Sequence, residues 1–142
     1  MVDITDKKNT LREAIAQAII RVNSSKTIDA IRENKVPKGD VFEISRAAGL
    51  LGIKKTSELL PDCHPIPIEF ASFEFKIKDL EIKILCTIKT IYKTGVEVEA
   101  MHGVTTVALN MYDMLKPIDK EIEISNIKLI KKTGGKSDIN IK

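Results

Sequence analysis

Hydrophobic and polar positions along the chain change their period several times, and each change predicts the boundary of an element. Apolar and polar residues alternate from Phe70 to Ile91 on both sides of a turn at Lys78 and Asp79, which is typical of a β-hairpin with one solvated face. The alternation returns from Glu121 to Ile130 and predicts one more strand. Three strands are therefore expected in the second half of the chain.

A helical period precedes the hairpin. The segment from Asp40 to Leu60 begins with Asp40 and Glu43 at the spacing of a capping box, and Pro61 ends it. One face of this helix is expected to contain Val41, Ile44, Ala48, Leu51 and Lys55.

A longer helical period lies between the hairpin and the last strand, from Thr94 to Pro117. One side of this helix is apolar and predicts contact with the core. The opposite side is polar and contains Glu99, His102, Thr106, Asn110 and Asp113. This polar side could face either a ligand or solvent.

The first quarter of the chain is harder to interpret. Alanine and the spacing of apolar residues favour a helix over Thr10 to Val22, but a strand stays open because the segment is short and a serine pair follows it. Ser25 to Asn34 predicts a short helix with a serine cap. Strands divided by helices, with one antiparallel hairpin, indicate an α+β sandwich with helices on one face of the sheet.

Length and composition fit a single domain over residues 1–142, with a loose leader at 1–8 and a mobile tail at 134–142. The 23 basic and 20 acidic residues leave a net charge of +3, which excludes an acidic disordered tail and a histone-like polycation. No apolar run approaches the roughly 18 residues of a membrane span, and the first residues lack a secretory pattern. We therefore expect a cytoplasmic protein without a membrane partner.

Asp62, Cys63 and His64 lie between two prolines, which stiffen the loop and present three reactive side chains together. The adjacent cysteine and histidine lack the usual spacing of zinc ligands, so a zinc site is not expected. A thiol nucleophile would need a nearby base, and an inert loop is an equally open interpretation. The second cysteine, Cys86, leaves too few thiols for a disulfide scaffold.

Charged residues at both ends of the longer helix are further candidates. Glu97 and Glu99 stand at its start, where the helix dipole favours carboxylates with or without a ligand. Asp113 and Lys116 stand three residues apart near its end and could form an ordinary surface ion pair.

Two basic segments could bind phosphate, because glycine turns and helix starts offer backbone N–H groups beside a lysine charge. They are Lys38-Gly39 and Lys131–Ser137. The second is not a P-loop, since Ile130 stands where the first glycine of that motif is required. A mobile basic tail is the simpler interpretation of that segment.

Five short motifs follow one another along the chain: Lys38–Phe42, Leu60–Pro65, Lys93–Ala100, Tyr112–Lys116 and Gly134–Ser137. Together they resemble the cyclic pyranopterin monophosphate synthases, the molybdenum cofactor biosynthesis protein C family. Each motif is weak alone, but the joint match covers the chain from about Met1 to Ser137 and is highly specific.

The resemblance implies a ferredoxin-like α+β fold, with helices packed on one face of a four-stranded antiparallel sheet. It also implies that Thr10 to Val22 is a strand, against the local propensity, and we adopt that assignment. The family assembles as a homohexamer, a trimer of dimers with active sites between subunits, which would also bury an uncovered strand edge.

The implied activity is that of a lyase. A 3′,8-cyclised dihydroguanosine triphosphate, made from GTP, becomes cyclic pyranopterin monophosphate with loss of pyrophosphate. The resemblance makes Lys38, Asp113 and Lys116 the catalytic set, in which a lysine exchanges protons if burial or other cations depress its pKa. No cofactor is implied, and whether Mg²⁺ accompanies the triphosphate stays open.

The resemblance also assigns substrate-binding positions to the proline-flanked loop, the helix start and several basic residues. They are Asp62, Cys63, His64, Glu97, Val98, Glu99, Arg12, Lys54 and Lys136. Asp62 and Val98 depart from the family pattern, which often has an apolar residue and a methionine at these positions. A carboxylate close to a triphosphate is unfavourable, so we expect Asp62 to face solvent.

The alternative is a non-catalytic ferredoxin-like module that binds nucleotides or RNA. Such sheets stack bases on exposed aromatic side chains of adjacent strands. Near the hairpin the aromatics are Phe70, Phe73, Phe75 and Tyr92, and no basic-aromatic RNA motif accompanies them. The synthase is therefore the preferred interpretation, with a small-molecule substrate and no nucleic-acid partner.

Overall fold

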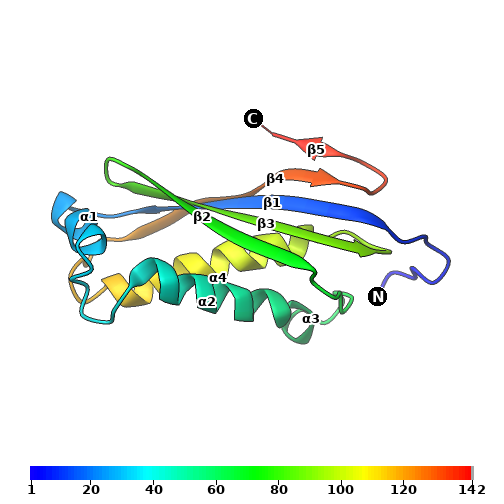
Figure 1. Ribbon diagram of the computed structural model, residues 1–142, viewed down its shortest axis with the longest axis horizontal. Helices are drawn as coiled ribbons and strands as arrows, with labels where there is room; N and C mark the ends of the chain where they lie inside the picture. Colours follow the sequence, from blue (N-terminus) through cyan, green and yellow to red (C-terminus); the bar gives the residue numbers. More distant parts are fainter. Residues whose placement is uncertain (142) are drawn as a thin grey trace.

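A computed structural model describes residues 1–141, in which five strands and four helices form an α+β arrangement. In chain order the elements are β1 (Thr10–Arg21), α1 (Ser25–Arg32), α2 (Val41–Lys54), α3 (Thr56–Leu59), β2 (Phe70–Lys78), β3 (Glu81–Tyr92), α4 (Glu97–Leu115), β4 (Glu123–Thr133) and β5 (Ile139–Asn140). The strands pair antiparallel in the order β2-β3-β1-β4-β5, and α2 and α4 lie together against one face of the sheet (Figure 1). Within these residues, no helix is long and apolar enough to cross a membrane.

The segment with ambiguous propensity is a central strand, as the family resemblance implied. β1 pairs with β3 along its whole length and with β4 on its other side. Its alternate residues Ala14, Ala16 and Ala18 have no exposed surface and belong to the core. Small side chains on this face let a helix approach the sheet closely, so packing overrides the helical propensity of alanine.

The expectation of a four-stranded sheet was wrong by one strand. β5 forms in the segment expected to be a tail and pairs with β4, with Lys131 opposite Asn140. Gly134 has a φ of 96°, which is strained for residues with a side chain, and it turns the chain after β4. A strand of two residues is too short to show an alternation of apolar and polar residues, so the sequence could not indicate it.

Helix α2 begins as expected but buries a different face. The Asp40 carboxylate accepts the Glu43 N–H at 3.1 Å, which confirms the N-terminal cap. Its buried residues are Val41, Ser45, Gly49 and Ile53. Two residues of the expected face, Ile44 and Leu51, are instead 43% and 59% exposed. At Ser45 and Gly49 the helix buries small residues because it packs closely against α4, a preference that a hydrophobic count does not detect.

The middle of α4's polar side forms the contact surface with α2. Asn110 donates from Nδ2 to Ser45 Oγ at 3.0 Å. Thr56 Oγ1 lies 2.9 Å from His102 Nδ1. Asn110 therefore joins α4 to α2 and His102 joins it to the short helix α3, and the ends of the polar side are left for a ligand.

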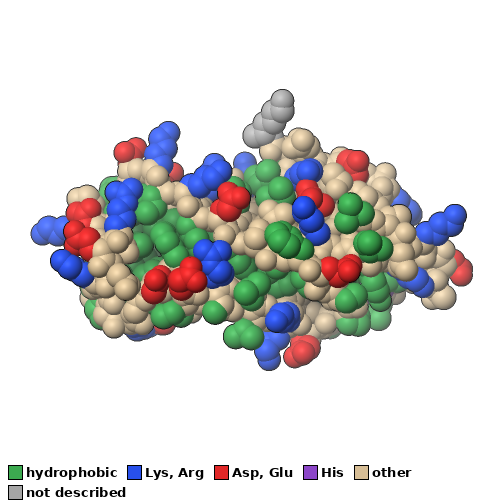
Figure 2. Space-filling model, in the orientation of Figure 1, with side chains coloured by type: hydrophobic (Ala, Val, Ile, Leu, Met, Phe, Trp, Pro, Cys, Tyr) green, Lys and Arg blue, Asp and Glu red, His purple; other side chains and the backbone are tan. Residues whose placement is uncertain are grey.

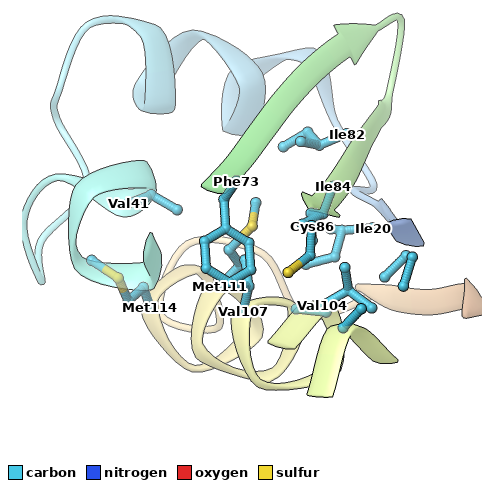
Figure 3. Packing of buried hydrophobic residues seen from close by; sticks show 14 of the residues in the cluster. Ile20, Val41, Phe73, Ile82, Ile84, Cys86, Val104, Val107, Met111 and Met114 are labelled. Carbon is cyan, nitrogen blue, oxygen red and sulfur yellow. The ribbon is translucent and has the colours of Figure 1, made fainter. Parts of the chain in front are cut away.

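The hydrophobic core lies between the sheet and these helices. Phe73 projects from β2 toward Val107 and Met111 of α4 (Figure 3). Phe75 stacks on Phe42 of α2 with ring centroids 4.3 Å apart, and Figure 2 shows apolar side chains between β2 and the helices on this side of the molecule. Phe73 and Phe75 thus face the helices, whereas Phe70 at the start of β2 is 48% exposed. A single exposed phenylalanine on β2 does not make the platform of adjacent aromatics that an RNA-binding sheet uses.

Replacing Gly49 by alanine should destabilise the protein, because the new Cβ would lie 2.5 Å from both Phe73 Cζ and Val107 Cγ2. This overpacking should outweigh the better helix propensity of alanine and lower the free energy of unfolding by about 1–3 kcal/mol. Urea denaturation followed by circular dichroism measures the change. Ala47→Leu enlarges an exposed position of the same helix and should alter stability by less than about 0.5 kcal/mol. Equal effects of the two substitutions would contradict the packing at Gly49.

Candidate active site

Most of the expected site residues lie on or near the two ends of α4. At its C-terminal end, Lys38 Nζ lies 3.1 Å from Asp113 Oδ2 and also donates to the Asp113 carbonyl oxygen at 2.9 Å. Lys116 Nζ lies 3.2 Å from Asp113 Oδ1. The fold thus joins Lys38, Asp113 and Lys116 into one group, called the Lys–Asp–Lys cluster below, although 75 positions separate Lys38 from Asp113.

Local structure presents these charges at the surface. Gly39 has a φ of 115° and turns the chain between Lys38 and the start of α2. Hydrogen bonds from Lys38, and then from Lys116, hold the pKa of Asp113 below its usual value. The three side chains are 40–53% exposed, so the ion pairs contribute little to stability and their charges are accessible to a ligand.

A cavity of about 410 Å³ lies at the N-terminal end of α4. Its lining consists of Leu60, Pro61, Asp62, Cys63, His64, Ile66, Thr94, Gly95, Glu97, Val98 and Glu99. The fold therefore brings the loop and helix-start residues of the expected substrate site to one cavity. Its volume is in the range of small-molecule sites.

Cys63 and Glu99 meet at the inner side of this cavity. Cys63 Sγ donates a hydrogen bond to Glu99 Oε2 at 3.5 Å, and Glu99 is only 3% exposed. Burial raises the pKa of Glu99, and the charge of Glu97 adds to the rise. Burial, followed by the Glu99 carboxylate, raises the pKa of Cys63 to about 11. The thiol is therefore a hydrogen-bond donor here and a poor nucleophile.

Lys132 is a residue of this region that the motifs did not single out. Its Nζ lies 2.9 Å from Glu97 Oε1, and the two side chains are 23% and 30% exposed. β4 brings the lysine to the cavity because it pairs with β1, which places Lys132 opposite Ala14. The sequence signal was the basic Lys131–Ser137 segment, which indicates phosphate binding but does not point to Glu97.

The basic residues expected to hold phosphates take different positions. Arg12 is 7% exposed and donates from Nε and Nη2 to the carbonyl oxygens of Tyr92 and Lys93, at 3.2 and 3.1 Å. It therefore ties β1 to the turn before α4. Lys54 is exposed and borders a neighbouring cavity that shares one lining residue with the first. Lys136 is exposed in the turn between β4 and β5.

The outer side of the proline-flanked loop faces solvent and the start of the chain. The Asp62 side chain is 89% exposed, as expected from its unfavourable charge beside a triphosphate. His64 Nε2 lies 2.7 Å from the Val2 carbonyl oxygen. Lys93 Nζ donates to the Thr5 carbonyl oxygen at 2.9 Å. The segment expected to be a leader thus contacts His64, which lines the cavity, and Lys93, which precedes the lining residue Thr94.

The cavity and the Lys–Asp–Lys cluster are well separated within one chain. Glu99 and Asp113 are fourteen residues apart on α4, which corresponds to about 21 Å along the helix axis. The packed surface of α4 with α2 and α3 lies between them. A small ligand in the cavity therefore does not reach the cluster of the same chain.

Comparison with known proteins identifies the family of this chain. The MoaC family model matches residues 1–135. A cyclic pyranopterin monophosphate synthase of Aquifex aeolicus is 48% identical over 137 residues, which cover 96% of this chain and 54% of that protein. The chain belongs to the MoaC family. Relatives of the same name from Peptoclostridium acidaminophilum and Clostridium perfringens are 47% and 46% identical, and each match covers 96% of this chain and 87% of the relative.

The family resemblance of the five motifs is thereby confirmed. The chain spans about half the length of the Aquifex relative, at 54%, and most of the length of the other two, at 87%. The MoaC match ends at residue 135, so it includes both ends of α4 and stops just before Lys136.

Cys63 of this MoaC-family chain should react slowly with iodoacetamide at neutral pH, because a pKa of about 11 leaves very little thiolate. Glu99→Gln removes a carboxylate that raises the pKa of the thiol, so alkylation should become several-fold faster. Mass spectrometry of the alkylated peptides measures the rates. Cys86 is fully buried and should stay unmodified in both proteins, which checks that they remain folded. An unchanged Cys63 rate in the variant would show that Glu99 has no electrostatic effect on the thiol.

Proposed function

We propose that this MoaC-family chain is a cyclic pyranopterin monophosphate synthase. It converts 3′,8-cyclised dihydroguanosine triphosphate into cyclic pyranopterin monophosphate with release of pyrophosphate, as a lyase of molybdenum cofactor biosynthesis. The observation that carries the proposal is the Lys–Asp–Lys cluster, in which Lys38 from the loop before α2 meets Asp113 and Lys116 at the end of α4. The names of relatives at 46–48% identity support the same activity.

The Lys–Asp–Lys cluster handles charge and protons in this reaction. Closing the cyclic phosphate forms a bond between a substrate hydroxyl oxygen and phosphorus and breaks the bond to pyrophosphate. The step therefore needs a group that takes up the hydroxyl proton and cations that stabilise the leaving pyrophosphate. Lys38 and Lys116 supply the positive charge and the exchangeable protons. Asp113 lies between the two ammonium groups and orients both of them.

The cavity receives the ring system of the substrate. Carboxylates accept hydrogen bonds from ring N–H groups, and a guanine-derived base offers several of these. Glu97 and Glu99 line the cavity and accept these hydrogen bonds. Positive charge for the phosphates comes from a wider set of basic residues, namely Arg12, Lys54, Lys132 and Lys136.

The active protein is a homohexamer, a trimer of dimers, in which one site combines the cavity of one chain with the Lys–Asp–Lys cluster of another. The separation of the two ends by the α2–α4 contact supports this assembly, because it keeps them apart within a chain. Large apolar residues on the outer surface also support it. Leu51, Leu59 and Leu109 are 59%, 63% and 61% exposed, which is unfavourable for an isolated chain.

The ferredoxin-like assignment belongs to the same proposal. The order β2-β3-β1-β4, with helices after β1 and after β3, supports a βαββαβ arrangement. A single synthase domain in the cytoplasm, without a nucleic-acid partner, fits a substrate made from GTP. Residues 1–141 contain no group of three or more His, Cys, Asp or Glu side chains that could hold a metal ion. Any Mg²⁺ would therefore be held mainly by the triphosphate, and no resident cofactor is proposed.

Lys116→Ala should abolish formation of pyrophosphate and cyclic pyranopterin monophosphate from the purified cyclised intermediate. The lysine is exposed, so its loss should leave the oligomer intact in size-exclusion chromatography. Lys120→Ala removes another exposed lysine outside the Lys–Asp–Lys cluster and is the matched control, with turnover near that of the wild type. Retained turnover in Lys116→Ala would remove this lysine from the mechanism.

Mixed oligomers of Lys116→Ala and Glu99→Gln chains should recover activity that neither variant has alone. If each site takes one end from each of two chains, random reassembly leaves about one quarter of the sites with both ends intact. Pyrophosphate release after joint refolding measures the recovery, with each variant refolded alone as the control. No recovery in refolded mixed oligomers would place each site within one chain.

A further inference from the structure

Two carboxyl groups border the same cavity but have different partners. Glu97 is paired with Lys132 at 2.9 Å. Glu99, two residues further along α4, receives a hydrogen bond from the Cys63 thiol on Oε2 at 3.5 Å. Among the described residues, Glu97 Oε2 and Glu99 Oε1 are buried without a hydrogen-bond partner. A buried oxygen without a protein partner is costly, so each of these oxygens needs a hydrogen bond from a ligand or an ordered water.

Glu99 has no cationic partner in residues 1–141. The loop after α3 contributes the uncharged Cys63 thiol, and α4 itself contributes the charge of Glu97. The cation of β4, Lys132, is bound to Glu97. On the same loop, the Asp62 carboxylate is turned to solvent and His64 contacts a backbone carbonyl near the start of the chain.

These surroundings give the carboxyl groups of Glu97 and Glu99 different tendencies to take up a proton. Burial is the main cause that raises the pKa of Glu99, so this carboxyl group takes up a proton more readily than a free glutamate does. Neighbouring acids with different environments commonly divide their roles into a proton carrier and a fixed charge.

We propose that Cys63 is a positioning residue that acts through Glu99: its thiol holds this carboxyl group in place as the proton-exchanging group of the cavity, while Glu97 with Lys132 supplies a fixed charge. This inference rests on the proposed function, because it assigns roles within the site that binds the cyclised intermediate. Cys63 performs no covalent chemistry in it.

A thiol suits this role for a physical reason. It is a weak donor, so it orients a carboxyl group without favouring the ionised form as strongly as an ammonium group would. The Cys63 N–H donates to the Leu60 carbonyl oxygen at 3.1 Å, and flanking prolines stiffen the loop, so the backbone sets the position of the sulfur atom. Its pKa of about 11 keeps the proton on sulfur throughout the range in which carboxyl groups titrate.

Infrared spectroscopy of the S–H stretch tests the contact in the ligand-free protein. The chain has two thiols, so Cys63→Ala assigns the Cys63 band and the core residue Cys86 serves as the internal reference. The Cys63 band should move in Glu99→Gln, and it should move with pH in the wild type, because a carboxylate is a stronger acceptor than an acid or an amide. A Cys63 band that is unchanged by both would overturn the contact.

The positioning role is tested by comparing Cys63→Ser with Cys63→Ala. The infrared band of the protonated Glu99 carboxyl group, identified by its absence in Glu99→Gln, gives the titration midpoint in each protein. Serine is the stronger donor and should lower this midpoint, whereas alanine removes the donor and should raise it, each by about half a pH unit. The pH profile of kcat/KM for the cyclised intermediate should shift in the same two directions, with serine retaining most of the activity that alanine loses. Shifts in one direction for both variants, or no shift, would overturn the role.

Failure of this inference and failure of the proposed function give different results. A wild type that turns over the intermediate, with a Glu99 midpoint insensitive to both substitutions, would overturn the positioning role alone. A wild type that makes no product would overturn the proposed function and, with it, proton exchange by Glu99 in this reaction. The infrared shifts would then still establish the thiol–carboxyl contact.

Discussion

Close packing of α4 against the alanine face of β1 is the constraint on which the rest of the structure depends. Ala14, Ala16 and Ala18 leave room for a straight helix of nineteen residues to lie along the sheet. Because that helix is rigid, it places Glu99 at one end of the molecule and Asp113 at the other. The small residues of α2 pack against α4 in turn, so the segments before and after α2 deliver the Lys38 loop and the proline-flanked loop to opposite ends.

The two ends of α4 have contrasting electrostatic character. The Lys–Asp–Lys cluster is exposed, and its cations can exchange their contact with Asp113 for contact with phosphate oxygens. Glu99 in the cavity is buried, and its low solvation strengthens each hydrogen bond that it accepts. A two-fold relation between chains would bring unlike ends together twice, forming two equivalent sites from one interface. This arrangement would explain why the cavity and the Lys–Asp–Lys cluster are far apart within one chain.

Much of the fold could be predicted from local signals. The hairpin, the Asp40 cap and the helix end before Pro117 depend on residues close together in the sequence, and the structure confirms them. The helix expected from Asp40 to Leu60 instead ends at Lys54, and the short helix α3 lies between it and Pro61. Predictions failed where an element's role depends on what it packs against. Leu51 lies on the expected apolar face of its helix and is exposed, because the helix presents glycine and serine to its neighbour. The polar middle of α4 likewise contacts α2 through Asn110 and leaves only the helix ends to a ligand.

The sequence by itself determined the family, the kinds of reactive group and the segments that carry them. These follow from residue identity and short spacing, which are encoded along the chain. Only the tertiary structure decided that Lys38 meets Asp113 and that Lys132 neutralises Glu97. It also decided that Cys63 reaches Glu99 across 36 positions. Such pairs depend on strand register and helix packing, because a local pattern defines which side of an element is apolar but not which distant element will cover it.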